Sequence, residues 1–183
     1  MAYSVQSQDI RPKGLKVGEA APDFEGINQF GQKVSLSEKL KEGKAVVLFY
    51  RGSWCSYCKR QLSDLQESLS DIMAKGAEVI AITPERQEGI KKLRSKLDLG
   101  FNILHDNNME IMRAYDVNYE LPEKQKEKFL KWDIDLKTIN AENGENLPVP
   151  AVYIVGQDGK IEFRFFDENF RKWVDMDDLI EKI

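Results

Sequence analysis

Cysteine and histidine are scarce in this sequence. Of its 183 residues only two are cysteine, Cys55 and Cys58, and one is histidine, His105. Two cysteines are too few for the disulfide-stapled scaffold of a small secreted protein. Together with one histidine they are also too few for a structural zinc site, which takes four ligands. We therefore expect no structural metal, and the two cysteines need another explanation.

Long apolar runs and an excess of positive charge are also absent. No apolar stretch approaches the roughly 20 residues of a membrane span. The chain has 27 Lys and Arg against 31 Asp and Glu, a net charge of −4, with the two signs interspersed. We therefore expect no membrane span and no nucleic-acid partner. The first 14 residues lack the apolar core of a signal peptide, which favours a cytoplasmic location, although a removed signal would leave the same sequence.

The order of apolar segments predicts one α/β domain. Residues 1–14 are expected to form a flexible N-terminal arm, and residues 15–183 a single domain of a size that suits one core. Strands and helices alternate, as in a parallel α/β sheet. Along the chain we expect a hairpin at 24–34, strands at 45–50, 77–83, 102–105, 151–155 and 161–165, and helices at 59–75, 87–97, 109–115 and 176–183.

Residues 118–146 interrupt this alternation. They are polar and charged, and Pro122 stands where a helix is expected to begin. Phe129, Leu130 and Trp132 give the segment an apolar patch. The plainest interpretation is a helical insertion packed on the domain. A lid over the cysteines and a contact in a homodimer are the alternatives.

Cys55 and Cys58 lie three residues apart, where a predicted buried strand is followed by a predicted helix. A helix N-terminus presents unpaired N–H groups and positive potential, which favour the thiolate form of a cysteine. A Cys-x-x-Cys pair in this position is typical of a redox-active dithiol. The alternative is that both cysteines are buried and unreactive. Their three-residue spacing, together with their position between a strand and a helix, disfavours it.

The chain as a whole resembles the AhpC/TSA (peroxiredoxin) branch of the thioredoxin-like superfamily. The resemblance covers residues 15–183 and implies a thioredoxin-like fold, with a central mixed β-sheet flanked by helices, an N-terminal extension and a helical insertion near 118–146. It is carried by the segments VGEAAPDF at 17–24, FYRGSWCSYC at 49–58, DNNMEIMRAYDV at 106–117 and LPVPAVYIVGQDG at 147–159.

The sequence departs from the typical peroxiredoxin pattern, Pro-x-x-x-Thr-x-x-Cys after Phe-Tyr. By that count the Pro falls on Arg51, the Thr on Cys55 and the peroxide-reacting Cys on Cys58, while a later Arg falls on Pro150. The missing Thr and Arg are two usual donors to the peroxide oxygens. In thioredoxins, by contrast, Trp54, Cys55, Cys58 and Pro150 all have counterparts. That likeness implies a cis Pro150 facing the disulfide, with the backbone of Val149 free to pair with an incoming peptide.

The expected activity is therefore thiol–disulfide exchange, in which Cys55 attacks and Cys58 resolves the mixed disulfide. Trp54 and Tyr57 are expected to shape the site. Arg51 is expected either to lower a cysteine pKa or to hold an anionic group, with a solvent-exposed position as its alternative.

Three partners follow from this activity: a protein disulfide or a peroxide as substrate, an external dithiol reductant such as a thioredoxin-type protein, and a second copy in a homodimer. No organic cofactor is expected, because the dithiol carries the electrons. Two other functions stay open. A thiol peroxidase would be attacked first at Cys58, with Cys55 resolving. A copper chaperone would hold Cu(I) between the two thiolates.

Overall fold

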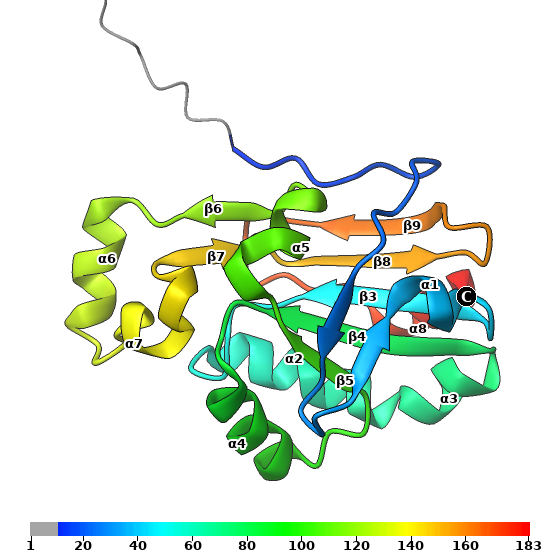
Figure 1. Cartoon of the computed structure of the whole chain (residues 1–183), viewed down its shortest axis with the longest axis horizontal. Helices are drawn as coiled ribbons and strands as arrows, with labels where there is room; N and C mark the ends of the chain where they lie inside the picture. The colour runs from blue at the N-terminus through cyan, green and yellow to red at the C-terminus, as the bar shows by residue number, and fades with distance from the viewer. Residues whose placement is uncertain (1–10) are drawn as a thin grey trace, which may run out of the picture.

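A five-stranded mixed sheet forms the centre of the computed structural model, which describes residues 11–183 (Figure 1). Its strand order is β5-β4-β3-β8-β9. Neighbouring strands β3, β4 and β5 are parallel, while β8 is antiparallel to both β3 and β9. The strands are β3 (Lys44–Phe49), β4 (Ala77–Thr83), β5 (Asn102–His105), β8 (Ala151–Val155) and β9 (Ile161–Phe166). The predicted central mixed sheet and its strands are confirmed.

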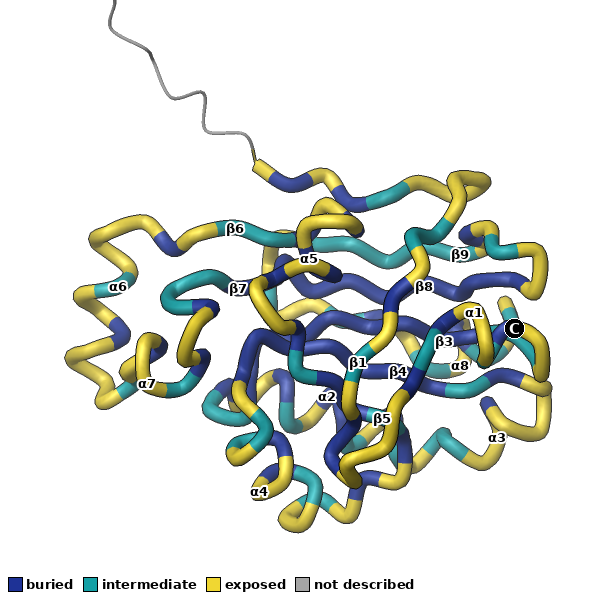
Figure 2. The backbone as a smooth tube through the Cα atoms, in the orientation of Figure 1, coloured by how far each residue is buried: buried dark blue, intermediate teal, exposed yellow. Residues whose placement is uncertain are grey.

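The inner strands are buried on both faces, which is why they appear in the sequence as continuous apolar runs. Ala45 to Phe49 are 0% exposed. Figure 2 shows β3 and β8 as almost unbroken dark tubes through the centre of the molecule. One layer of helices consists of α2 (Ser56–Glu67), α3 (Leu69–Ala74), α4 (Gln87–Leu97) and α8 (Met176–Lys182), which pack into one core cluster.

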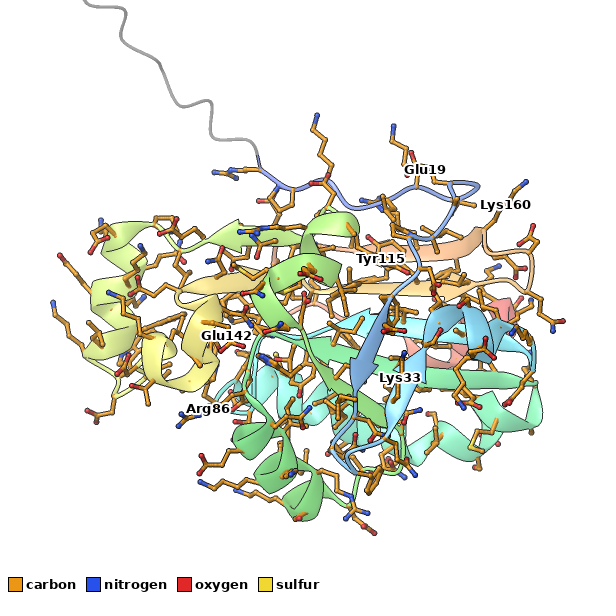
Figure 3. All side chains as sticks on the ribbon, viewed as in Figure 1. Glu19, Lys33, Arg86, Tyr115, Glu142 and Lys160 are labelled. Carbon is orange, nitrogen blue, oxygen red and sulfur yellow. The ribbon has the colours of Figure 1, made fainter. Side chains whose placement is uncertain are left out.

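The opposite face carries the second core cluster, in which Tyr115, labelled in Figure 3, is fully buried. It is covered by α1 (Leu36–Leu40), by the hairpin of β1 (Glu25–Ile27) and β2 (Lys33–Ser35), and by α5 (Glu110–Ala114) with the 3₁₀ turn η1 (Asn107–Met109) before it. The predicted helix 59–75 is two helices that meet at Ser68, and Gly76, at φ +79°, ends the second as expected.

The insertion forms a small subassembly at the end of the sheet toward which β3 runs (Figure 1). It has its own apolar cluster of Leu121, Phe129, Leu136 and Leu147. Its elements are β6 (Asn118–Glu120), α6 (Glu123–Leu130), α7 (Leu136–Asn140), η2 (Ala141–Asn143) and β7 (Asn146–Pro148), with β6 antiparallel to β7. Pro122 caps the start of α6, as predicted.

Polar contacts fix the insertion to the sheet. The Asn143 side-chain amide donates to the carbonyls of Pro84 (2.9 Å) and Asp106 (2.7 Å). Glu142 is 2.8 Å from the Nε2 atom of His105, and the Arg86 N–H donates to the Ile139 carbonyl at 3.2 Å. Arg86 and Glu142, both labelled in Figure 3, mark this junction. The insertion is therefore anchored beside the ends of β4 and β5.

One expectation about Pro150 is wrong. The Val149–Pro150 peptide bond is trans, and the Val149 N–H already donates to the Val117 carbonyl at 2.8 Å. The trans form is the ordinary one for a bond before proline, favoured by about 0.5–1 kcal/mol. The Val149 contact continues the pairing of β6 with β7. The backbone N–H of Val149 is therefore not free to pair with an incoming peptide. Pro150 itself is buried at the start of β8.

The N-terminal arm is described only in part. Residues 1–10 of the predicted flexible arm lie outside the described residues. After them, the Gly14 N–H donates to the Asp116 carbonyl at 2.9 Å, and Arg11 lies 3.1 Å from Glu168. Across residues 11–183, no helix is long and apolar enough to cross a membrane.

Candidate active site at the Cys55–Cys58 turn

The end of β3 and the start of α2 together place the two cysteines. Beyond β3, the Tyr50 N–H still donates to the Ile82 carbonyl at 3.0 Å, so the strand direction is held up to the turn. Cys55 is the N-cap residue of α2, and its sulfur accepts the Cys58 N–H at 3.4 Å. A sulfur at this position replaces the usual oxygen cap and receives a donor that the helix leaves unpaired. The first turn of α2 thus directs its N–H groups at Cys55.

Both cysteines are free thiols beneath the surface, Cys55 being 4% exposed and Cys58 1%. The Cys58 thiol, which donates to the Cys55 sulfur, is the largest cause that lowers the pKa of Cys55 to about 6; burial opposes it. The Cys58 N–H, the charge of Arg51 and the Tyr57 N–H also lower this pKa. The same thiol contact and burial raise the pKa of Cys58 well above its usual value. Cys55 therefore has the more acidic thiol of the two, and the thiolate is the reactive form of a cysteine.

Arg51 is buried, at 4% exposed, so the solvent-exposed alternative for it is wrong. Its guanidinium carbon lies 4.1 Å from the centre of the Phe170 ring, 4.8 Å from that of Trp54 and 5.6 Å from that of Phe129. Cation–π contacts of this kind hold the guanidinium, which forms no ion pair with a carboxylate of residues 11–183. The positive charge thus lies inside an aromatic box formed by Trp54, Phe129 and Phe170, near enough to Cys55 to lower its pKa.

Trp54 and Tyr57 form the outer edge of the site. The Trp54 ring packs on Phe129 of the insertion, with ring centres 5.2 Å apart. Tyr57 is 39% exposed and meets Phe170 edge to face at 5.7 Å. The insertion therefore contacts the cysteine turn through Phe129, and the segment after β9 contacts it through Phe170.

The absence of a side chain at Gly52 leaves room for the Trp54 ring. Its φ is +147°, and an added Cβ would lie 2.4 Å from Trp54 Nε1. Replacing Gly52 by alanine should therefore lower the free energy of unfolding by about 3 kcal/mol, through backbone strain and overpacking together. Gly18→Ala is the matched control, because Gly18 has φ +90° with nothing within 4 Å. Strain alone should cost it about 1 kcal/mol in urea unfolding. Equal losses in the two variants would mean that Trp54 exerts no steric demand.

Several residues of the site were not anticipated from the sequence. Glu85 is 3% exposed and accepts the Ser53 backbone N–H at 2.7 Å and the Ser53 hydroxyl at 2.5 Å. Burial raises the pKa of Glu85, against these two hydrogen bonds. Tyr119 of β6 is close enough to both cysteines for their charges to act on its hydroxyl; burial is the main cause that raises its pKa. Glu85 thus holds the cysteine turn through Ser53. Tyr119, from the insertion, lies near the two cysteines.

Comparison with known proteins shows the family of the chain. Residues 17–164 match the model of the AhpC/TSA family. The chain is 32% identical over 109 residues to a thiol-disulfide oxidoreductase ResA of Oceanobacillus iheyensis, covering 57% of this chain and 56% of that protein. A ResA of Bacillus thuringiensis subsp. konkukian is 24% identical over 157 residues, 85% of this chain and 73% of that protein.

The fold has solved counterparts as well. The crystal structure of the peroxidoxin BcpB from Mycobacterium tuberculosis superposes with a TM-score of 0.72 at 17% identity, covering 92% of this chain and 96% of that one. At this identity the likeness shows the fold alone, and the predicted thioredoxin-like fold is confirmed. Since the family model spans most of the chain, this protein belongs to the AhpC/TSA family.

Proposed function

We propose that the protein is a thiol–disulfide oxidoreductase that uses Cys55 and Cys58 as its redox couple. The Cys55 thiolate attacks one sulfur of a substrate disulfide, the other substrate sulfur leaves as a thiolate, and a mixed disulfide remains on Cys55. Cys58 then loses its proton and attacks the Cys55 sulfur, which releases the second substrate thiolate and leaves a Cys55–Cys58 disulfide. An external dithiol, such as that of a thioredoxin-type protein, restores both thiols.

The observation that carries this proposal is the unequal state of the two thiols. Cys55 caps the helix and has a pKa of about 6, whereas Cys58 lies deeper and has a raised pKa. An attacking thiol and a resolving thiol need this difference. The two relatives named thiol-disulfide oxidoreductase support the same activity. The aligned part of the chain covers only 56% of the first relative's length. The activity of that relative therefore supports our proposal and does not by itself assign the activity of this protein.

A peroxidase is the less favoured function. It would need Cys58 as the thiolate that attacks peroxide, yet Cys58 is 1% exposed and its pKa is raised. No Thr stands at the position that usually donates to the peroxide; Cys55 itself occupies it.

In our proposal Arg51 stabilises the Cys55 thiolate, while Trp54 and Tyr57 form the rim that a substrate meets. Homodimer formation and a cytoplasmic location stay predictions from the sequence.

Trapping separates the two functions. Pre-reduced protein is mixed with a disulfide-bonded peptide or with hydrogen peroxide, and intermediates are quenched with acid and weighed by mass spectrometry. We expect Cys58→Ser to accumulate the mixed disulfide with the peptide and Cys55→Ser to give none. Rapid peroxide oxidation that persists in Cys55→Ser and vanishes in Cys58→Ser would instead establish a peroxidase. The reverse pattern, with disulfide reduction much faster than peroxide reduction, supports exchange.

A further inference from the structure

Arg51 is a buried cation whose charge no carboxylate of residues 11–183 balances. Among the described residues it takes part in no ion pair, and its enclosed Nε has no hydrogen-bond acceptor. The two acids that precede Phe170 in the chain pair with other cations, Glu168 with Arg11 at 3.1 Å and Asp167 with Lys172 at 3.0 Å. A guanidinium keeps its charge at all ordinary pH values, and a buried charge without a counter-charge is costly. The aromatic box relieves this cost only in part.

The charge next to Arg51 changes with the redox state of the turn. In the reduced protein the Cys55 thiolate is the anion that faces Arg51. Formation of the Cys55–Cys58 disulfide converts both sulfurs to neutral atoms and removes that anion. Arg51 keeps its charge in both redox states, and two of its three rings, Phe129 and Phe170, belong to segments outside the cysteine turn. The oxidised protein therefore holds an uncompensated guanidinium beside the sulfur that a reductant must attack.

We propose that Arg51 in the disulfide form binds a carboxylate of the incoming reductant, so that thiols carrying an acidic group near the sulfur re-reduce the protein preferentially. This inference rests on the dithiol function proposed above and adds the chemical class of the reductant to it. A guanidinium presents several N–H donors in a fixed plane, which suits a carboxylate. The reduced protein should not share this preference for anions, because the negative charge of the Cys55 thiolate already compensates the charge of Arg51.

The reduction balances as follows for a monothiol. A reductant thiolate attacks the Cys55 sulfur, the Cys55–Cys58 bond breaks, and Cys58 leaves as a thiolate that takes up a proton. A second reductant thiolate then attacks the reductant sulfur of the mixed disulfide. The products are the reductant disulfide and the Cys55 thiolate, so two electrons pass from two thiols to the protein. Arg51 acts in the first step, where the carboxylate of the reductant is brought beside it.

Small thiols of different charge test this inference. The disulfide form is reduced with 3-mercaptopropionate, 2-mercaptoethanol or cysteamine under pseudo-first-order conditions, and each rate constant is expressed per thiolate present. We expect 3-mercaptopropionate to exceed the neutral thiol by about tenfold in the wild type, the size of one charge-assisted hydrogen bond. Cysteamine should be the slowest. Added acetate at constant ionic strength should slow 3-mercaptopropionate and leave 2-mercaptoethanol unaffected.

Two variants assign the preference to Arg51. Arg51→Met should bring the ratio of anionic to neutral thiol to about one, and Arg51→Lys should keep part of it. Arg60→Met is the matched control, because Arg60 is an exposed cation on α2 near the same turn. It removes the same charge and should retain the preference.

Equal rates per thiolate in the wild type would overturn the inference without any variant. So would an equal loss of preference in Arg60→Met, which would assign it to general surface charge. Normal reduction by all three thiols with no preference leaves the dithiol function intact and removes only this inference. A disulfide that none of them reduces would remove both.

Discussion

Alkylation of the reduced protein should reveal one fast thiol whose reactivity rises with pH through a midpoint of about 6. This thiol is Cys55, whose pKa is lowered first by the Cys58 thiol and further by the Cys58 N–H, Arg51 and the Tyr57 N–H. The sign follows from the thiolate being the reactive form. Below the midpoint Cys55 is protonated and slow, and above it the rate reaches a plateau. An ordinary cysteine would instead show its midpoint near 8.5, as free cysteine does.

The effect of removing Cys55 is correspondingly large. In the wild type the contact with the Cys55 thiol and burial raise the pKa of Cys58 well above its usual value. Replacing Cys55 removes the contact and leaves burial, which still raises this pKa. An ordinary thiol is only about 3% thiolate at pH 7, so Cys55→Ser should lower the iodoacetamide rate at pH 7 by at least about 30-fold. The measurement is a stopped-flow or quenched time course from pH 4.5 to 9, with the modified cysteine identified by peptide mapping.

Two replacements of Cys58 give the matched control. Cys58→Ser keeps a hydroxyl that can donate to the Cys55 sulfur, whereas Cys58→Ala removes the side-chain donor altogether. The alanine variant should therefore have the higher Cys55 midpoint of the two, and Arg51→Met should also raise it. Because midpoints are compared, the limited access to a sulfur that is 4% exposed affects every variant alike. An unchanged midpoint in Cys58→Ala would show that the thiol–thiol hydrogen bond does not govern Cys55.

The sequence predicted those parts of the site that depend on neighbouring residues. The apolar run of β3 and the helical spacing of α2 meet at Cys55, and local rules for strands and helix termini suffice to place this cysteine at the start of α2. The central sheet was predicted for the same reason, since strands buried on both faces are apolar throughout. Arg51 was singled out by its position before Cys55, although its burial could not be derived.

The rest depends on contacts between distant segments. Phe129 and Phe170 contact Arg51 only because the insertion and the segment after β9 fold over the same turn. The expectation that the Val149 N–H is free for a peptide failed for a similar reason, because its acceptor is the carbonyl of Val117, on the other side of the insertion. Glu85 follows a strand and Pro84, where a charged residue is normally exposed. The sequence offers one indication that Glu85 is buried, which is Gly89, an unfavourable residue in the first turn of α4.

Replacing Gly89 by alanine should lower the free energy of unfolding while the Glu85 side chain is present, but not after Glu85 has been replaced by alanine. A Cβ at Gly89 would lie 2.1 Å from Glu85 Oε1. The carboxylate cannot simply turn away, because Ser53 holds it by its N–H at 2.7 Å and its hydroxyl at 2.5 Å. Gly89→Ala should therefore lower the free energy of unfolding by about 2 kcal/mol. Glu85→Ala alone should lower it by about 1–3 kcal/mol, since the Ser53 N–H loses its acceptor.

The double variant decides whether these two residues act as a unit. Without the Glu85 side chain, alanine at position 89 meets no carboxylate and gains the usual advantage of alanine over glycine in a helix, about 1 kcal/mol. Gly89→Ala should thus change sign, from destabilising in the wild type to stabilising in Glu85→Ala. Urea unfolding of the four proteins measures the coupling, expected at about 3 kcal/mol. Additive losses would contradict the close packing of α4 on Glu85. With the coupling, the trapping rate of Cys58→Ser should fall in the Gly89→Ala background, because Ser53 and the turn that carries Cys55 lose their fixed support.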